Sequence, residues 1–245
     1  MWQWQDVNWR NWKIILKLDP DKEIKDSILG DILSHKGLDA LIVGGTQNIT
    51  RDNTEALLDR IYQLGYRGPL LQEISELNAI SLNVDGYLLP VVLNAGHRDW
   101  FIGQHLSGIK TLGKFVNWSQ VLVEAYVICN PHCATARRTR ALVPDREELF
   151  AYQTLIEEVY NLPVLYVEYS GQYGNPAWLQ ELKARQKKAH IFYGGGIEDL
   201  SQAQEMGAFA DTIIIGNLIY RHPRKLMEIL DHRVKGSAKK ECRGV

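Results

Sequence analysis

The feature that most constrains the fold is a series of eight short apolar runs, rich in β-branched residues and spaced along the whole chain. Each run has about the length of a strand, and amphipathic stretches separate the runs. Continuous apolar runs of this kind are typical of strands buried on both faces, as in a parallel sheet. In chain order they are residues 12–18, 40–43, 69–74, 86–92, 121–129, 164–169, 190–193 and 212–215.

Stretches with helical periodicity fill most of the gaps between these runs. The clearest are residues 53–64, 145–160, 176–188 and 201–207. Alternating strands and helices predict a parallel sheet in an α/β protein, and eight such strands predict a closed (β/α)₈ barrel, the TIM barrel. A chain of 245 residues suits one such barrel, so we expect a single domain over residues 1–230.

Two segments depart from this alternation. The gap at residues 75–84 is too short for a helix with its two connecting turns, so the third helix is expected to be missing or replaced by an extended segment. Residues 231–245 carry five Lys and Arg residues and no apolar periodicity, which predicts a disordered basic tail. A basic tail can bind anionic lipid, but a solvated tail is the preferred interpretation.

Composition narrows the classes of function. The 28 Lys and Arg residues balance 29 Asp and Glu residues, so no positive field favours nucleic acid. No apolar run approaches the roughly 18 residues that a membrane span needs, and the first residues lack the pattern of a signal peptide. We therefore expect a cytoplasmic protein, which would reach a lipid substrate by transient contact with a membrane surface.

Cysteine and tryptophan positions suggest structural roles. Three cysteines form an odd, sparse set that indicates reduced thiols rather than disulfides. Cys129, His132 and Cys133 would need a fourth ligand to hold zinc, and none is evident nearby. The tryptophans near the start of the chain are expected to cap the bottom of the barrel rather than to lie in a membrane interface: Trp2, Trp4, Trp9 and Trp12.

Function in such barrels lies at the carboxyl ends of the strands. After the first run, Lys17 and Asp19 point to the same side, as a phosphate-binding cation beside a carboxylate for Mg²⁺ would. An ordinary ion pair or helix cap has the same pattern. After the second run, Gly44 and Gly45 let a ligand approach the backbone and Thr46 offers a hydroxyl, although a tight turn also uses these residues.

The sixth run carries a carboxylate within an apolar strand. By alternation, Tyr166, Glu168 and Ser170 share one face. A buried, unpaired charge costs roughly several kcal/mol, so Glu168 should meet a cation, a donor or a substrate. Strand five offers only Asn130 where an isomerase with two opposed acids would need a second carboxylate.

Glycines follow the seventh and eighth runs, at Gly194-Gly195-Gly196 and at Gly216-Asn217. Glycine-rich ends of these two strands are the standard phosphate cradle of such barrels, in which backbone N–H groups face the anion. The pair therefore indicates a ligand that carries phosphate, without specifying the reaction.

As a set, these motifs resemble the geranylgeranylglyceryl-phosphate synthase group, and more closely its bacterial PcrB branch, the heptaprenylglyceryl-phosphate synthases. The resemblance extends from about residue 12 to residue 220 and covers nearly the whole barrel. It is carried by residues 17–20, 44–46, 85–87, 90–94, 99–103, 124–126, 166–171, 192–197 and 210–217.

The resemblance implies that the protein is a homodimer of barrels in which the third helix is replaced. It also implies that the protein is a Mg²⁺-dependent prenyltransferase. A polyprenyl chain, heptaprenyl by the PcrB branch, would pass from its diphosphate to the 3-hydroxyl of sn-glycerol 1-phosphate, in lipid biosynthesis. By matching position, Asp19 and Thr46 would hold Mg²⁺. The glycerol phosphate would be bound by Lys17, Tyr166, Val167, Glu168, Tyr169, Ser170, Gly171, Gly196, Gly216 and Asn217.

We hypothesise that Glu168 orients the acceptor hydroxyl and takes its proton, beside Lys17. An apolar groove for the prenyl chain is expected among Tyr87, Leu89, Val91, Trp100, Phe101 and Ile102, although core packing explains each residue singly. The alternative is a phosphosugar isomerase or aldolase on the same kind of barrel, in which Lys17 would form a Schiff base. A barrel that only binds an anion is a third reading.

Overall fold

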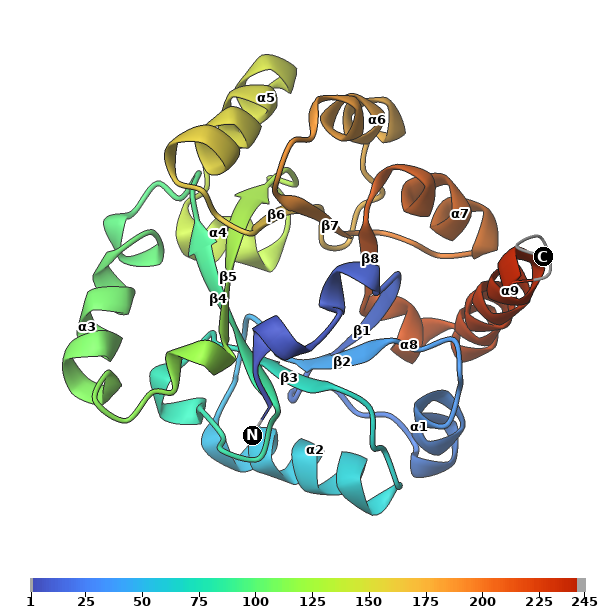
Figure 1. Ribbon diagram of the computed structural model, residues 1–245. Coiled ribbons are helices and arrows are strands. Elements are labelled where there is room, and N and C mark those ends of the chain that lie inside the picture. Colours follow the sequence, from blue (N-terminus) through green and yellow to red (C-terminus); the bar gives the residue numbers. More distant parts are fainter. Residues whose placement is uncertain (1, 242–245) are drawn as a thin grey trace.

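The computed structural model describes residues 2–241, with side chains described through residue 233. Its centre is a closed barrel of eight parallel strands in sequence order, seen end-on in Figure 1. The predicted barrel is confirmed, and every strand coincides with a predicted apolar run. The strands are β1 (Ile14–Leu18), β2 (Ala40–Val43), β3 (Leu70–Glu73), β4 (Gly86–Val92), β5 (Val121–Ile128), β6 (Val164–Glu168), β7 (His190–Gly194) and β8 (Thr212–Ile215).

Helices surround the barrel, and the four predicted ones correspond to α2 (Arg51–Gln63), α5 (Arg146–Thr154), α6 (Pro176–Arg185) and α7 (Leu200–Phe209). The last turn of the predicted stretch 145–160 is a π-helical turn, η6 (Leu155–Val159), rather than α-helix. None of the helices in residues 2–241 is long and apolar enough to cross a membrane. The helices are α1 (Asp26–Leu33), α2 (Arg51–Gln63), α3 (Gly103–Leu112), α4 (Ala134–Thr139), α5 (Arg146–Thr154), α6 (Pro176–Arg185), α7 (Leu200–Phe209), α8 (Asn217–Arg221) and α9 (Pro223–Glu241).

The connection between β3 and β4 contains no α-helix. It holds only a 3₁₀ turn, η3 (Leu77–Ala79), which confirms that the third helix of the barrel is replaced. Strand β4 consequently alternates between buried and half-buried residues, whereas β6, β7 and β8 are buried throughout. The β3–β4 connection thus places no α-helix against the barrel, and α3, which follows β4, lies outside that strand (Figure 1).

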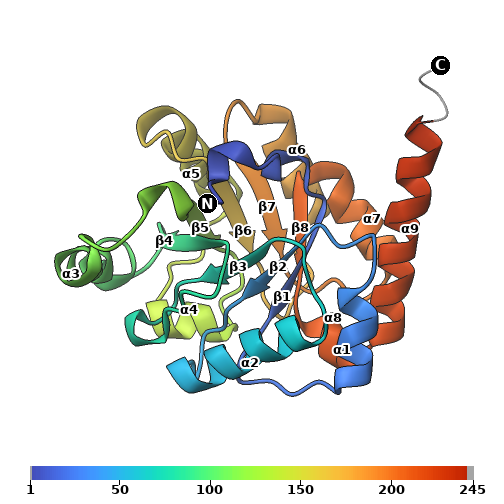
Figure 2. The same cartoon turned by 60° about the horizontal axis from the view of Figure 1, so that its bottom comes forward.

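The amino-terminal segment closes one end of the barrel, opposite α4 and α8 (Figure 2). Trp4, Trp9 and Trp12 are buried and pack into the barrel interior. The Trp9 ring lies 5.1 Å from that of His190, whose pKa burial lowers to about 4. The indole N–H of Trp4 donates to the carbonyl oxygen of Gln120 over 2.9 Å. The expected cap is thus present, and these buried tryptophans are unavailable as membrane anchors.

The prediction of a disordered tail from residue 231 is wrong as far as residue 241. Helix α9 continues to Glu241, and only residues 242–245 of the predicted tail lie outside the described residues. Leu226, Ile229 and Leu230, in the first turns of this helix, are buried. Because this packed segment supplies the helix nucleus, the following Lys, Ala and Glu residues extend it despite lacking an apolar stripe.

Candidate active site

A polar cavity of about 640 Å³ lies at the carboxyl ends of the strands. It is lined by predicted site residues from five separate regions of the chain, which the barrel brings together. They include Lys17, Asp19, Thr46, Tyr166, Glu168, Ser170, Gly171, Gly196, Gly216 and Asn217. Every predicted site residue is in this set except Val167 and Tyr169.

Val167 and Tyr169 face the opposite side of β6. Both are buried in the core between the barrel and its helices. Strand alternation explains this, since Tyr166 and Glu168 point inward and their neighbours cannot. The Tyr169 side chain instead packs beneath Gly195, where an added Cβ would lie 2.4 Å from the Tyr169 Cβ. The side chains of Val167 and Tyr169 therefore shape the loop, and any contact with a ligand would come from their backbone.

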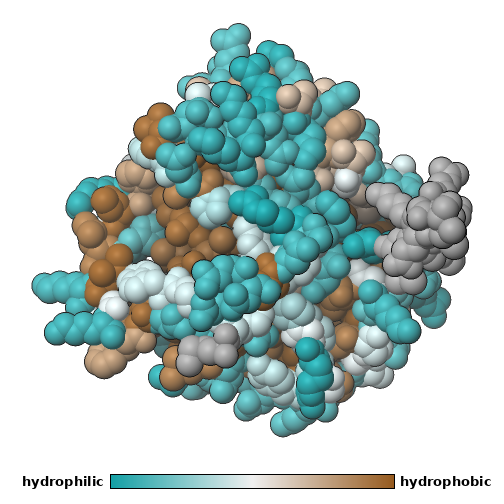
Figure 3. Space-filling model, in the orientation of Figure 1, coloured by the Kyte–Doolittle hydropathy of each residue, from teal (hydrophilic) through white to brown (hydrophobic). Residues whose placement is uncertain are grey.

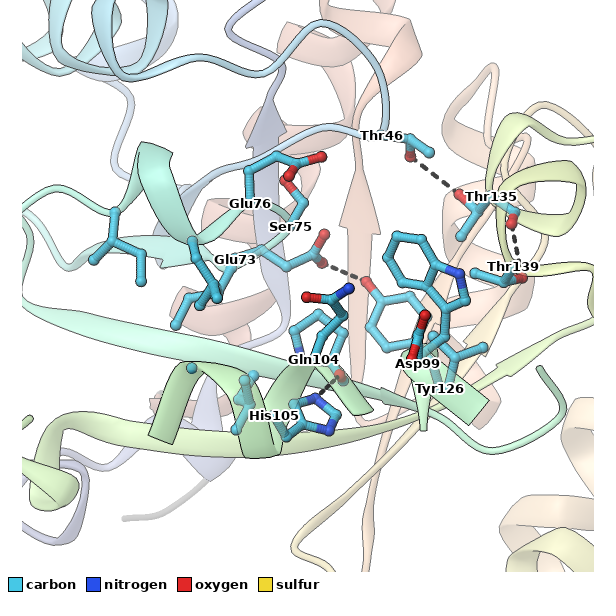
Figure 4. A pocket seen from close by; sticks show the side chains of 18 of the residues that line it. Thr46, Glu73, Ser75, Glu76, Asp99, Gln104, His105, Tyr126, Thr135 and Thr139 are labelled. Atoms are coloured by element: carbon cyan, nitrogen blue, oxygen red, sulfur yellow. Dashed lines mark hydrogen bonds between the residues drawn. The ribbon is translucent and has the colours of Figure 1, made fainter. Parts of the chain in front are cut away.

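Lys17 lines the polar cavity and is held by the carboxylate of Glu73, a residue that was not predicted from the sequence. Its ammonium donates to Glu73 Oε1 over 2.6 Å, and the hydroxyl of Tyr126 donates to the other oxygen of Glu73, a contact visible in Figure 4. Burial lowers the pKa of Lys17, but the charges of Glu73 and Glu168 outweigh it, so the net pKa is raised. Lys17 is therefore a fixed cation.

Glu168 ends β6 with only 3% of its surface exposed. Its Oε1 accepts a hydrogen bond from the backbone N–H of Ser170 over 2.5 Å. Burial raises the pKa of Glu168, while Lys17 and the Ser170 hydrogen bonds partly offset the rise. A carboxylate with a raised pKa, facing a cavity, is suited to accept a proton.

A third buried carboxylate, Glu124, lies on β5 inside the barrel. Neither of its oxygens has a hydrogen-bond partner among the described residues, and it is fully buried. Burial, followed by the charge of Glu73, raises its pKa well above the usual range. Glu73 and Glu124 both stand in predicted apolar runs, so the signal that identified Glu168 could have identified them too.

Asp19 and Thr46 lie on neighbouring loops of the polar cavity. Gly45 allows the loop after β2 to lie close to Asp19, because a Cβ at this position would be 2.5 Å from Asp19 Oδ1. The hydroxyl of Thr46 is 3.1 Å from that of Thr135 on α4. Lys22 adds a cation at this rim, 3.5 Å from Asp19 Oδ2, and donates to Asn217 Oδ1 over 2.9 Å. Among residues 2–241, no three His, Cys, Asp or Glu side chains gather into a ready-made metal site.

Glycines form the wall of the cavity after β7 and β8. Gly196 has a positive φ of 51°, and a Cβ there would lie 2.2 Å from the backbone of Gln172 and Tyr173. No other residue could hold this backbone so close to the loop after β6. The consequence is a surface of main-chain groups from Gly195, Gly196 and Gly216 around the cavity.

An apolar groove of about 300 Å³ joins the polar cavity at Lys17, Thr46 and Glu168. It runs between α3 and the uncovered side of β4, as far as Val121 at the beginning of β5. Figure 3 shows hydrophobic side chains around a hollow beside α3. His105 fastens α3 to this side of the barrel through a 3.0 Å hydrogen bond with the carbonyl oxygen of Pro90.

The groove contains two of the six residues predicted for it. Leu89 and Trp100 line it, whereas Tyr87 and Val91 do not, and Phe101 and Ile102 are more than a third exposed. The predicted residues belong to strand four and the beginning of its helix, whereas walls from the β3–β4 connection and from the rest of α3 were not predicted. The residues missed include Ile74, Leu77, Ile80, Gly108, Ile109 and Leu112.

The two cysteines in the described part of the chain, Cys129 and Cys133, are buried thiols. Cys133 Sγ accepts the N–H of Ala136 at the start of α4, and the Cys129 thiol faces the carbonyl oxygen of Val127. Burial raises the pKa of both thiols, that of Cys129 to about 12.

Comparison with known proteins places the chain among enzymes of prenyl lipid synthesis. The heptaprenylglyceryl phosphate synthase of Brevibacillus brevis is 42% identical over 87% of this chain and 92% of its own length. That of Anoxybacillus flavithermus is 38% identical over 93% and 97%. The (S)-3-O-geranylgeranylglyceryl phosphate synthase of Thermoplasma acidophilum, solved with sn-glycerol-1-phosphate, shares the fold at a TM-score of 0.76 and 19% identity, covering 91% of this chain and 93% of that one.

The model of the PcrB family matches residues 7–233, which include every residue of the polar cavity and the groove described above. The chain therefore belongs to the PcrB family.

Proposed function

We propose that this protein is a prenyltransferase that joins a polyprenyl chain, heptaprenyl in the first instance, to the 3-hydroxyl of sn-glycerol 1-phosphate. The observation that carries the proposal is the meeting of a glycine-walled polar cavity and an apolar groove at Lys17, Thr46 and Glu168. One compartment suits a phosphate and the other suits a hydrocarbon chain. The names of the relatives and the ligand of the Thermoplasma enzyme support this pairing.

The glycerol phosphate would occupy the polar cavity. Backbone groups at Gly196 and Gly216 would bind its phosphate, as at the ends of strands seven and eight in other phosphate-binding barrels. Ser170 and Asn217 add polar side chains to the same wall. The acceptor hydroxyl would then point toward Glu168 and the mouth of the groove.

In the reaction, the bond between the allylic carbon of the prenyl chain and its diphosphate oxygen breaks. The acceptor hydroxyl forms the new carbon–oxygen bond, its proton passes to Glu168, and diphosphate leaves. Glu168 suits this role because burial raises the pKa of its carboxyl toward that of a useful base. Lys17, held as a cation by Glu73, stabilises negative charge at the junction of the two compartments.

Asp19 and Thr46 are the residues that would hold Mg²⁺. One carboxylate and one hydroxyl fit this ion, because Mg²⁺ takes oxygen ligands and usually completes its shell with water and substrate phosphate. Bound there, the ion would neutralise charge on the leaving diphosphate. Asp19 is 22% exposed and borders the polar cavity, so its carboxylate is open to such a ligand.

The Schiff-base alternative is disfavoured by the environment of Lys17. A Schiff base requires a neutral amine, and the raised pKa of Lys17 keeps its ammonium protonated. Treatment with borohydride in the presence of a phosphosugar should leave the mass of the protein unchanged.

Homodimerisation and a cytoplasmic location stay predictions. Light scattering would test the first of them.

The decisive experiment combines purified protein, Mg²⁺ and sn-glycerol 1-phosphate with prenyl diphosphates of increasing length, and identifies products by mass spectrometry. We expect prenylglyceryl phosphate ethers, with turnover highest for the long chains. Asp19→Ala should abolish turnover and its dependence on Mg²⁺, while Asp21→Ala, on the same loop, serves as control. If the unmodified protein formed no ether product, the proposal would be refuted.

A further inference from the structure

The surface around α3 carries an unusual concentration of exposed hydrophobic side chains. Of the eleven large hydrophobic residues exposed in the described part of the chain, six lie between residues 101 and 118. Soluble proteins usually scatter such residues singly, and a contiguous group marks a binding surface. We call this group the α3 face: Phe101, Ile102, Leu106, Ile109, Phe115 and Trp118.

The exposure within this face is large. Phe115 is 85% exposed, Leu106 is 51% exposed and Trp118 is 49% exposed. Ile102, Leu106 and Ile109 follow the spacing of one helical stripe, and each is more than a third exposed. Figure 3 shows hydrophobic surface on the side of the molecule where Figure 1 places α3.

Charge along this segment has one sign. Residues 100–123 contain no Asp or Glu, and Lys110 and Lys114 are both exposed there. In the part of the chain that the structure describes, neither lysine forms an ion pair. Of the flanking acids, Glu124 is fully buried, and the half-exposed Asp99 lies 3.3 Å from His97. Glu76 beside the groove is paired with Arg138.

The α3 face is continuous with the apolar groove. Ile109 and Trp118 belong to both, so the groove opens among the exposed hydrophobic residues. Each buried methylene contributes about 0.8 kcal/mol, so a long prenyl chain resides in a bilayer rather than in water. A groove mouth facing water would leave the chain to cross solvent between bilayer and active site.

We propose that the α3 face docks on an anionic lipid bilayer and sets the groove mouth against it, so that the polyprenyl chain passes between bilayer and enzyme without entering water. Exposed aromatic side chains beside lysines are suited to the bilayer interface, and the lysines are attracted to anionic lipid. A second copy fits this face less well, because a two-fold contact uses the same face on both copies and residues 100–123 offer no acid to pair with Lys110 and Lys114. The inference rests on the proposed polyprenyl substrate.

Vesicle flotation of the full chain tests the proposal, with neutral phosphatidylcholine and with phosphatidylcholine mixed with phosphatidylglycerol. We expect stronger binding to the anionic vesicles, weakened by salt. The pair Leu106→Glu and Phe115→Glu, and separately the pair Lys110→Glu and Lys114→Glu, should each lower binding at least about tenfold. None of these four residues lines the groove.

The matched control is the pair Leu142→Glu and Val159→Glu, which are 73% and 64% exposed outside the α3 face. It should bind vesicles like the unmodified protein. All variants should convert geranyl diphosphate, a short soluble donor, at the unmodified rate, which checks folding and separates this test from that of the proposed function.

Three outcomes would overturn the docking proposal. The first is equal loss of binding in the control pair, and the second is absence of binding to anionic vesicles in protein that converts geranyl diphosphate. The third is an α3-face variant that binds vesicles normally but has lost an oligomer seen by light scattering, which would make the face a contact between copies of this chain.

Discussion

The strands in the two halves of this barrel differ in how deeply they are buried. Strands β6, β7 and β8 are buried throughout, and the glycines and carboxylate at their ends face a polar cavity. Strand β4 is half-buried along much of its length, because only the turn η3 precedes it where a helix would normally stand. One half therefore holds a polar, anion-accepting site, and the other holds an apolar groove.

The contrast shows how one missing helix changes what a phosphate-binding barrel can do. The enclosed half keeps the cradle common to many barrels, and the open half adds space for a hydrocarbon chain beside it. Glu73 lies in the open half at the end of β3 and holds Lys17, which lines both compartments. The proposed chemistry depends on this junction, so the most informative tests perturb one half and measure the other.

The largest effect is expected at the junction itself. Glu168→Gln keeps the shape of the side chain but removes its ability to take a proton, so turnover should fall by about 10²–10⁴-fold. Steady-state assays with saturating glycerol phosphate would measure this, and circular dichroism would confirm the fold. Turnover within a few-fold of the unmodified protein would remove Glu168 from the role of base.

Blocking the groove should affect long chains selectively. Gly108 lines the groove, and a Cβ there would be 2.9 Å from the end of the Leu77 side chain. Gly108→Leu should therefore lower kcat/KM for heptaprenyl diphosphate by at least about 10–200-fold, the range for a single methylene group that does not fit an apolar pocket. Geranyl diphosphate should be much less affected.

The control for this change is Ser107→Leu, which adds the same side chain at an exposed position of the same helix. It should leave both donors unaffected. If Gly108→Leu lowered the rates with both donors equally, the groove would not be the site of the distal prenyl chain.

The pH profile should report the burial of Glu168. Burial raises the pKa of this carboxyl above the usual 4.5, and the reaction requires its ionised form. The rate should therefore fall about tenfold per pH unit below the raised pKa, so that the acid limb lies at higher pH than for an ordinary glutamate. Measured kcat/KM against pH would test this, and Glu168→Gln should lack that limb.

The smallest expected effect is the contribution of Glu124 to the pH dependence of folding stability. Because its pKa is raised on folding, the native state binds the proton more tightly than the unfolded chain. Its contribution to stability is thus present at low pH and is lost as pH rises from about 4.5 toward the folded pKa, by up to about 1.4 kcal/mol per unit.

Glu124→Gln removes this titration while keeping the side chain polar and of similar size. Urea unfolding at about pH 5 and about pH 7 should show the variant gaining stability relative to the unmodified protein as pH rises. Parallel stability curves for the two proteins would mean that Glu124 is ionised in the folded state.

Much of the architecture could be predicted from the sequence, because short β-branched runs buried on both faces have few other arrangements. The eight strands, the replaced third helix and the cap of tryptophans followed from local pattern and spacing. The tail did not, since whether Asp231 and its successors continue a helix depends on how Leu226 and Leu230 pack before them. Helix nucleation is a tertiary event there.

The candidate site divides in the same way. Lys17, Asp19, Glu168 and the glycines could be named as candidates without a structure, because strand ends carry function in barrels and a charge in an apolar strand needs a partner. The folded chain was needed to show that Glu73 holds Lys17, that Val167 and Tyr169 face outward, and that the β3–β4 connection lines the groove. These are contacts between distant segments, and local pattern carries no information about which side chains meet across a barrel.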